Sequence, residues 1–181
     1  MTDVLQLNPE LSGDNKFIAD VHLGGLAKYL RLCGFDTLYR MSLSDREIIR
    51  LSLAENRIIL TCDKELLKNK HIINGYRIIS AKPVEQLREV MKRYDLINNL
   101  NPFTRCMECN GEVVNVTKEE IEETLQPKTR NYYNEFKKCT GCGKIYWEGS
   151  HYERMKIFVD SLISSHQSSV TSHQSPIINN Q

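Results

Sequence analysis

The sequence has no long apolar run and no strong excess of charge of either sign. None of its hydrophobic stretches approaches the roughly 20 residues that a membrane-spanning helix needs. The first residues, MTDVLQLNPELSGDNK, lack a basic segment followed by an apolar one, so we expect no signal peptide. The 181 residues carry a formal net charge of +1, which provides no global field for attracting nucleic acid or a membrane. We therefore expect a cytoplasmic protein with no membrane partner, in which any basic surface is local.

Disulfide bonds are not expected in a cytoplasmic protein, so the six cysteines need another explanation. Each of the motifs RCMECNG and KCTGCGK can place two thiolates on one side of a tetrahedral ion, and a glycine follows where the chain turns back. Zinc prefers such a closed four-thiolate site, and a segment of under about 50 residues has too small a core to fold without one. The predicted ligands are Cys106, Cys109, Cys139 and Cys142.

We therefore predict a zinc ribbon whose Zn²⁺ is structural, because four cysteine ligands leave no coordination position open for water or substrate. A redox pair, an iron–sulfur cluster and chance spacing are the alternatives. The stretches EVVNV and KIYWEG are expected to be strands beside the metal, and SHYERMKIFVDSLISS a final helix that opens with a capping box.

The first half of the chain alternates between short apolar runs and amphipathic segments. The runs KFIAD, FDTLYR, RIILTCD and YRIIS are expected to be strands, and the segments that follow them show helical spacing of apolar residues. Ser44 and Glu47 form a capping box for one helix, and Pro83 begins another. This alternation predicts an α/β unit with a mostly parallel sheet that helices cover on both faces. Cys33 and Cys62 are interpreted as small buried apolar side chains.

The sequence thus divides into four parts. We expect a flexible leader over residues 1–15, an α/β domain over 16–100, the zinc ribbon with its C-terminal helix over 101–165, and a disordered tail over 166–181. The tail repeats Ser-His-Gln-Ser and has no apolar pattern, which is why we expect it to lack structure.

Three acidic residues lie at or just after the ends of the expected strands. Asp20 ends the first strand, Asp63 ends the third, and Asp45 lies after the second in the first turn of a helix. Ligands of open parallel sheets collect beyond the carboxyl ends of the strands, so the three acids are expected on one edge. Clustered carboxylates repel unless a hard cation such as Mg²⁺ or Mn²⁺ neutralises them, and such a cation can activate water. The alternatives are a helix-dipole role for Asp45 and the start of the short helix KELLK for Asp63.

Four stretches resemble, in the same order, the Mut-7 C-terminal RNase domain family. They are FIADVHLGGLAKYLRLCGFDTLY, ENRIILTCDKELL, RCMECNG and FKKCTGCGKIYWEGSHYERM, and the resemblance spans residues 16–158. It implies a PIN-like nuclease fold that carries a zinc ribbon. It also implies that Asp20, Asp45 and Asp63 are the catalytic acids that bind Mg²⁺ or Mn²⁺, and that the four cysteines are the ribbon's ligands.

The sequence departs from this family at three positions near the acids. Cys62 and Gly25 stand where the family usually has arginine, which removes two cations that can hold a phosphate. His22 stands where methionine is usual. It is either a phosphate contact, a neighbour of the metal, or incidental.

Local basic and aromatic residues are candidates for contacting RNA. The basic candidates are Lys28, Arg31, Lys64 and Arg105, with solvated surface charge as the alternative for each. The ribbon holds an aromatic group that either stacks bases or, as we favour, packs between ribbon and sheet. Its members are Tyr146, Trp147, His151 and Tyr152.

The leading hypothesis is a metal-dependent ribonuclease in which the three acids bind Mg²⁺ or Mn²⁺ and metal-activated water attacks the RNA phosphodiester. The alternatives are a non-catalytic RNA-binding protein that uses the PIN-like fold and the ribbon, and a regulatory protein that acts through a partner. Acids that lie apart from one another favour the binding protein.

Overall fold

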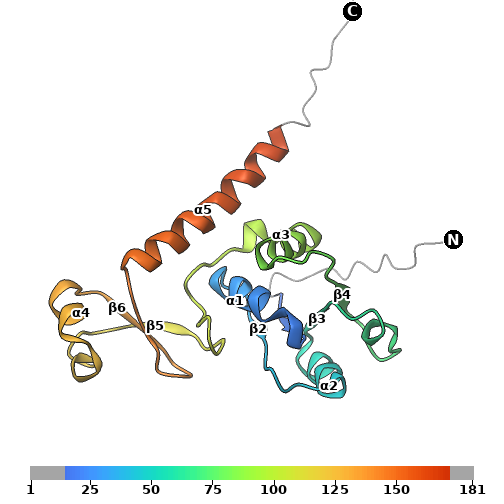
Figure 1. The fold of residues 1–181 in the computed structure, drawn as a ribbon, viewed down its shortest axis with the longest axis horizontal. Helices are drawn as coiled ribbons and strands as arrows, with labels where there is room; N and C mark the ends of the chain where they lie inside the picture. Colours follow the sequence, from blue (N-terminus) through green and yellow to red (C-terminus); the bar gives the residue numbers. More distant parts are fainter. Residues whose placement is uncertain (1–14, 172–181) are drawn as a thin grey trace, which may run out of the picture.

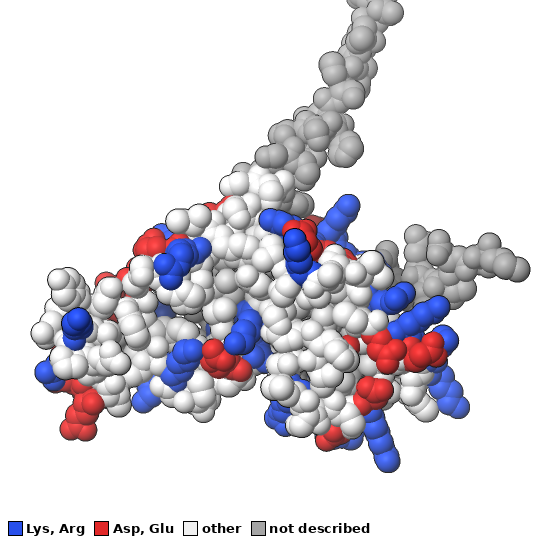
Figure 2. Space-filling view, in the orientation of Figure 1, with Lys and Arg blue, Asp and Glu red and all other residues white. Residues whose placement is uncertain are grey.

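The computed structural model describes the backbone of residues 15–171 and the side chains of residues 15–165. It contains an α/β unit followed by a small three-stranded ribbon, and the last helix, α5, runs from the ribbon past α3 (Figure 1). Residues 1–14 of the predicted leader and 172–181 of the predicted tail lie outside the described residues. Basic and acidic side chains are interspersed on the face drawn in Figure 2, in keeping with the formal net charge of +1.

Four parallel strands form the sheet of the α/β unit in the order β2-β1-β3-β4. Their bounds are Phe17–Ala19 (β1), Thr37–Leu38 (β2), Ile58–Thr61 (β3) and Gly75–Arg77 (β4). The helices are α1 (Gly24–Leu32), α2 (Asp45–Glu55) and α3 (Pro83–Tyr94), with short 3₁₀ helices η1 (Val21–Leu23), η2 (Leu66–Lys68) and η3 (Leu96–Asn99). The predicted α/β class, a parallel sheet flanked by helices, is confirmed.

The central strands alternate between two hydrophobic cores on opposite faces of the sheet. Phe17 and Leu60 belong to the core that α1 and α3 cover. Ile18 and Ile59 belong to the smaller core that α2 and η2 cover. Because both faces are covered, these strands are continuous apolar runs in the sequence.

Local sequence signals set the helix ends as predicted. Ser44 and Glu47 form the capping box of α2, with the Ser44 backbone nitrogen 2.9 Å from a carboxylate oxygen of Glu47. Pro83 is the first residue of α3, where its missing N–H costs no hydrogen bond. Gly34 follows α1 with a φ of +96°, a left-handed conformation that favours glycine.

The ribbon is an antiparallel sheet in the order β5-β6-β7. Its elements are β5 (Val113–Val116), η4 (Glu122–Thr124), α4 (Pro127–Tyr132), β6 (Phe136–Cys139) and β7 (Ile145–Trp147). β5 and β7 confirm the two predicted strands. The central strand β6 is not indicated by its sequence, FKKC, because two of its four residues are lysines. Pairing with a strand on each side makes this segment a strand.

Helix α5 (Ser150–Thr171) links the ribbon to the α/β unit. Phe158 and Leu162 pack against the larger core, and the Phe158 ring lies 5.1 Å from that of Tyr29. The helix continues to Thr171, so the backbone of residues 166–171, expected to be disordered, is helical. Once packing has fixed the first turns, each further residue adds a hydrogen bond at little extra cost. Within residues 15–171 no helix is long and apolar enough to cross a membrane.

Candidate functional site

The four cysteines of the two Cys-x-x-Cys motifs converge on one point. Their Sγ atoms all lie within 4.8 Å of one another, with Cys106 to Cys142 at 3.6 Å and Cys109 to Cys139 at 3.3 Å. Tetrahedral zinc with Zn–S bonds of about 2.3 Å separates its sulfur ligands by about 3.8 Å. The cluster therefore fits a four-thiolate metal site. It is the one group of three or more potential metal ligands this close together among the described residues.

Hydrogen-bond donors surround the cysteine sulfurs. The backbone nitrogens of Gly141 and Cys142 lie 3.3 and 3.4 Å from Cys139 Sγ, and the Tyr146 hydroxyl lies 3.0 Å from Cys106 Sγ. Burial raises the pKa of Cys106, but hydrogen bonds from Tyr146 and the backbone outweigh it and lower the pKa to about 6. The protein thus favours at least one thiolate at neutral pH, which is the form that a metal ion binds.

The residue directly after each motif turns the chain in a left-handed conformation. Asn110 has a φ of +73° and Gly143 a φ of +74°. Gly111, which we expected to serve this turn, is needed for space instead. A Cβ at this position would lie 2.9 Å from Cys139 Sγ. Glycine therefore lets the first motif approach the second.

Asp20 lies at the carboxyl edge of the sheet, where β1 and β3 end. Its side chain is nearly buried, at 6% exposed. The carboxylate accepts hydrogen bonds from the backbone nitrogens of His22 at 2.8 Å and Cys62 at 3.1 Å, and from the Thr61 hydroxyl. The exposed ring of His22 lies 3.6 Å from the same carboxylate. A carboxylate is thus held rigidly at the predicted edge.

Asp45 and Asp63 lie together in a different hollow of the surface. Both are exposed, and they line a depression of about 480 Å³ with Glu65 and His71. Asp63 Oδ1 accepts a hydrogen bond from the backbone nitrogen of Glu65 at 2.7 Å, and Asp45 is the first residue of α2. Asp45 therefore has the position that the helix-dipole role requires, whereas Asp63 holds the turn before η2, which begins only at Leu66.

The structure does not gather the three acids at one point. Within the described residues, their carboxylates do not form a group with all ligand atoms inside 4.8 Å, as the cysteines do. Asp20 accepts hydrogen bonds at the ends of β1 and β3, and it does not line the hollow that Asp45 and Asp63 share.

Glu89 of α3 is a further acid at this edge, which our sequence analysis missed. Its two carboxylate oxygens each accept a hydrogen bond at 2.9 Å, from the backbone nitrogens of Ile79 and Ser80 beyond β4. An acid on an amphipathic helix usually faces water, so nothing in the sequence distinguishes it. Burial and the charges of Asp20 and Glu89 raise the pKa of Cys62, while Arg77 opposes them. The charges of both carboxylates therefore reach the Cys62 thiol.

Comparison with known families agrees with this architecture. The Mut7-C RNAse domain matches residues 15–159, which is most of the chain. The chain belongs to this family. No curated protein and no solved structure matches it.

The structure explains one of the Mut7-C domain's departures and corrects our interpretation of another. A Cβ at Gly25 would lie 2.7 Å from Pro83 Cγ, so the close contact of α1 with α3 excludes a side chain there. Cys62 is exposed, so its interpretation as a buried residue is wrong. The turn after β3 carries this side chain out of the core. Cys33 is buried as expected, and burial raises its pKa to about 12.

Three of the four basic candidates lie at the surface of the Mut7-C domain. Lys28 is exposed, with its Nζ 3.5 Å from a carboxylate oxygen of Glu108. Arg105 is partly exposed and donates to the carbonyl oxygen of Asn110 at 3.2 Å. Lys64 is exposed after β3.

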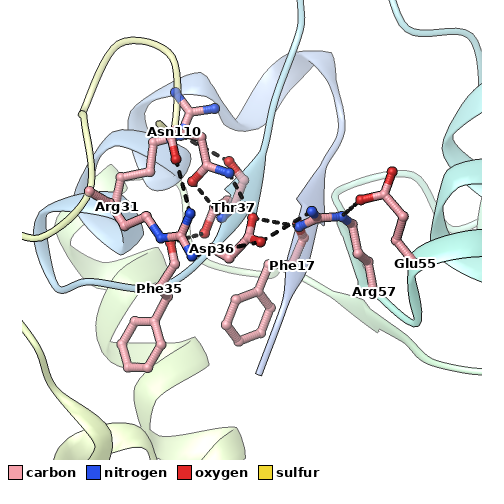
Figure 3. A network of polar contacts seen from close by, with 9 residues as sticks. Phe17, Arg31, Phe35, Asp36, Thr37, Glu55, Arg57 and Asn110 are labelled. Atoms are coloured by element: carbon pink, nitrogen blue, oxygen red, sulfur yellow. Dashed lines mark hydrogen bonds and ion pairs between the residues drawn. The ribbon is translucent and has the colours of Figure 1, made fainter. Parts of the chain in front are cut away.

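Arg31 is not at the surface, which corrects its assignment as an RNA contact. It is 2% exposed, and its guanidinium donates to the carbonyl oxygen of Thr37 at 2.9 Å (Figure 3). It also donates to the carbonyl oxygens of Met107 at 3.1 Å and Glu108 at 2.9 Å. In the sequence, Arg31 lies one helical turn after Lys28, so both are expected on the same exposed helix surface. In the structure, the ribbon covers this end of α1. The charge of Arg31 therefore binds the first cysteine motif to the α/β unit.

A second polar contact joins the same two units. The Asp36 carboxylate accepts hydrogen bonds from Arg57 at 2.7 Å and from the Asn110 side chain at 2.6 Å (Figure 3). The Thr37 backbone nitrogen in turn donates to the Asn110 side chain at 2.9 Å. The residue that turns the first cysteine motif is thus also tied to β2.

The aromatic residues of the ribbon do not form the packing seam between ribbon and sheet that we favoured. None of them is buried, although Tyr146 and Tyr152 are half-buried, and all four line one hollow of the ribbon that Lys28 of α1 borders. Tyr152 alone packs as expected, with its ring 4.5 Å from that of Phe103 in the connector. The four residues are Tyr146, Trp147, His151 and Tyr152.

Proposed function

We propose that this Mut7-C domain is a metal-dependent ribonuclease that hydrolyses RNA phosphodiester bonds. The observation that carries the proposal is the family match over residues 15–159, in a chain that holds the Asp20 carboxylate at the carboxyl edge of a parallel sheet. Ligands of such sheets bind at this edge.

In this proposal Asp20, Asp45 and Asp63 are the catalytic acids and the ligands of Mg²⁺ or Mn²⁺. Carboxylate oxygens are the donors that these hard cations prefer, and Asp45 and Asp63 are exposed to solvent. When bound, the cation supplies an activated water and neutralises charge on the phosphate. The hydrogen bonds from Thr61 and Cys62 fix the direction of the Asp20 carboxylate. Lys28, Lys64 and Arg105 are the proposed contacts to RNA phosphates.

We also propose that the cysteine cluster holds one structural Zn²⁺. The sulfur separations match a tetrahedral thiolate site, and the four ligands leave no position for substrate. The ion would therefore stabilise the ribbon and take no part in cleavage.

A non-catalytic RNA-binding protein is the second candidate function. The observation that favours it is the separation of Asp20 from the hollow of Asp45 and Asp63. Cys62 and Gly25, which stand where the family usually has arginine, point the same way.

Cleavage of an end-labelled RNA pool tests the two candidates. Wild type should cleave with Mn²⁺ or Mg²⁺ and not without them, while Asp20→Asn should lose cleavage because it loses the buried charge. Asp95→Asn is the matched control, because Asp95 is exposed, ends α3 and has a left-handed φ that asparagine tolerates. Equal cleavage by wild type and Asp20→Asn would reject the ribonuclease, and RNA binding without cleavage would establish the second candidate.

A further inference from the structure

A hollow of about 520 Å³ lies on the ribbon, where Lys28 of α1 borders it, and we call it the inter-unit groove. Its walls come from the connector, the first cysteine motif, β5, β6, β7 and the start of α5. Its volume lies in the range of sites that bind small organic ligands. The basic and aromatic residues of its lining include Lys28, Phe103, Tyr133, Lys137, Lys144 and Trp147, and Glu108 is one of its acidic residues.

Two pairs of aromatic rings from separate elements line the inter-unit groove, with Trp147 exposed and the other three rings half-buried. Trp147 of β7 is 40% exposed, and its ring lies 6.3 Å from that of Tyr133, at the end of α4. The Phe103 and Tyr152 rings form a second pair, 4.5 Å apart. An aromatic face left open to solvent forgoes the stabilisation that burial of its apolar surface would give. Unpaired bases stack on such faces.

Charged side chains accompany these rings. Four basic and three acidic residues line the groove, among them two lysines that share one acid. Glu108 lies 3.5 Å from Lys28 Nζ and 3.1 Å from Lys144 Nζ. Lys144 Nζ also lies 5.8 Å from the centre of the Tyr146 ring. Figure 2 shows basic side chains with an acidic group among them where this face is hollowed.

The groove is continuous with the first helix of the α/β unit. Lys28 lies one helical turn beyond Gly24, which follows the short η1 helix that Asp20 caps. A strand that passes Lys28 can therefore run from the groove towards the carboxyl edge of the sheet. A folded protein partner would need a broad apolar face, whereas stacking rings beside paired lysines suit a base and its phosphate.

We propose that the inter-unit groove binds unpaired nucleotides of an RNA strand. A base stacks on Trp147, and phosphate oxygens replace the Glu108 carboxylate as the partner of Lys28 and Lys144. Lys137 contacts a further phosphate. The identity of the ligand as RNA rests on the proposed function, but binding in the groove does not require that the acids cleave it.

Binding of fluorescein-labelled single-stranded U7 and A7 RNA to the zinc-loaded full chain tests the inference. Fluorescence anisotropy is measured without added Mg²⁺ or Mn²⁺, so that cleavage does not interfere. Trp147→Ala should weaken binding roughly 5- to 150-fold, the usual effect of losing one stacked base. Tyr132→Ala is the matched control, because Tyr132 is 83% exposed on α4 and does not line the groove. It should bind as wild type does.

A second pair of variants leaves the aromatic residues intact. Lys137 and Lys138 are neighbours on β6, and only Lys137 lines the groove. Lys137→Gln should weaken binding and reduce the dependence of log K on log salt by about 0.7, the value for one phosphate contact on a single strand. Lys138→Gln should leave both unchanged. Glu108→Gln should tighten binding several-fold, because it frees two lysines.

The outcomes separate this inference from the ribonuclease. Binding of RNA in the groove is rejected if wild type does not bind the single strands, or if it binds an RNA duplex equally well. It is also rejected if Trp147→Ala and Lys137→Gln bind as their controls do. Asp20-dependent cleavage alongside unchanged binding by the groove variants would reject the groove and keep the enzyme. Loss of binding in the groove variants of a protein that cleaves nothing would keep the groove and reject the enzyme.

Discussion

Arg31 donates a hydrogen bond of 2.9 Å to the backbone carbonyl oxygen of Glu108, a residue 77 positions further along the chain. This bond ties α1 to the first cysteine motif, and Asn110 adds a second tie to Asp36. The backbone nitrogens of Asn101 and Phe103 also donate to the carbonyl oxygens of Cys33 and Leu32, at 3.1 Å each. The ribbon is therefore anchored to one corner of the α/β unit.

Loss of the metal should disturb the α/β unit at this corner. We expect Cys109→Ser, or removal of zinc by a chelator, to lower hydrogen-exchange protection most in residues 105–147 and next in residues 31–37. The reason is that the proposed Zn²⁺ would stabilise the ribbon, and two carbonyl partners of Arg31 belong to the ribbon. β3 and β4 should keep their protection. Equal loss throughout the chain would show that the two units fold as one.

Arg31→Met should be strongly destabilising. The change keeps a long apolar stem but leaves three carbonyl oxygens without their donor, at a cost of about 3 kcal/mol in the free energy of unfolding. Urea unfolding measures the difference. Arg88→Met, which breaks an exposed pair with Glu85 on α3, should cost under about 1 kcal/mol. Similar costs for both variants would mean that burial of Arg31 contributes little.

Restoring the family's arginines should have opposite effects at the two positions. Cys62→Arg should fold normally and bind RNA more tightly at low salt, because position 62 is exposed. Gly25→Arg should lower the melting temperature, since a Cβ there would lie 2.7 Å from Pro83 Cγ. Adding Pro83→Ala to Gly25→Arg should recover part of that loss. Thermal melts measure the stability of both variants, and fluorescence anisotropy measures their binding of labelled RNA. A stable Gly25→Arg together with a destabilised Cys62→Arg would contradict this expectation.

Stability should fall in acid as Asp36 is protonated. Burial raises the pKa of Asp36, but hydrogen bonds from Arg57 and Asn110 outweigh it and lower the pKa below its usual value. A lowered folded-state pKa stabilises the fold above the unfolded value of about 3.9, and this stabilisation is lost as the pH falls through the folded value. Urea midpoints between pH 7 and pH 3 should drop more steeply below about pH 4 for wild type than for Asp36→Asn. Parallel curves would contradict this role for Asp36.

Local chemistry in the sequence was sufficient for the elements of the α/β unit and for the cysteine cluster. The capping box of Ser44 and Glu47, Pro83 at the start of α3 and the apolar run of β3 act through neighbours in the chain, so their outcomes follow from a short stretch. The four cysteines can also be recognised from the sequence as one cluster. A Cys-x-x-Cys motif already brings two sulfurs together, and an ion with four sulfur ligands requires two such motifs.

Only the tertiary structure decided which side chains meet. Arg31 and Lys28 share a helix and a charge, yet the ribbon covers one and leaves the other at the surface. Asp20, Asp45 and Asp63 all follow strands, but turn geometry sends Asp20 into hydrogen bonds with β3 and the other two into a separate hollow. Glu89 reaches the same edge from α3 through the packing of that helix. Such meetings depend on the positions of several elements at once, and no local spacing in the sequence encodes them.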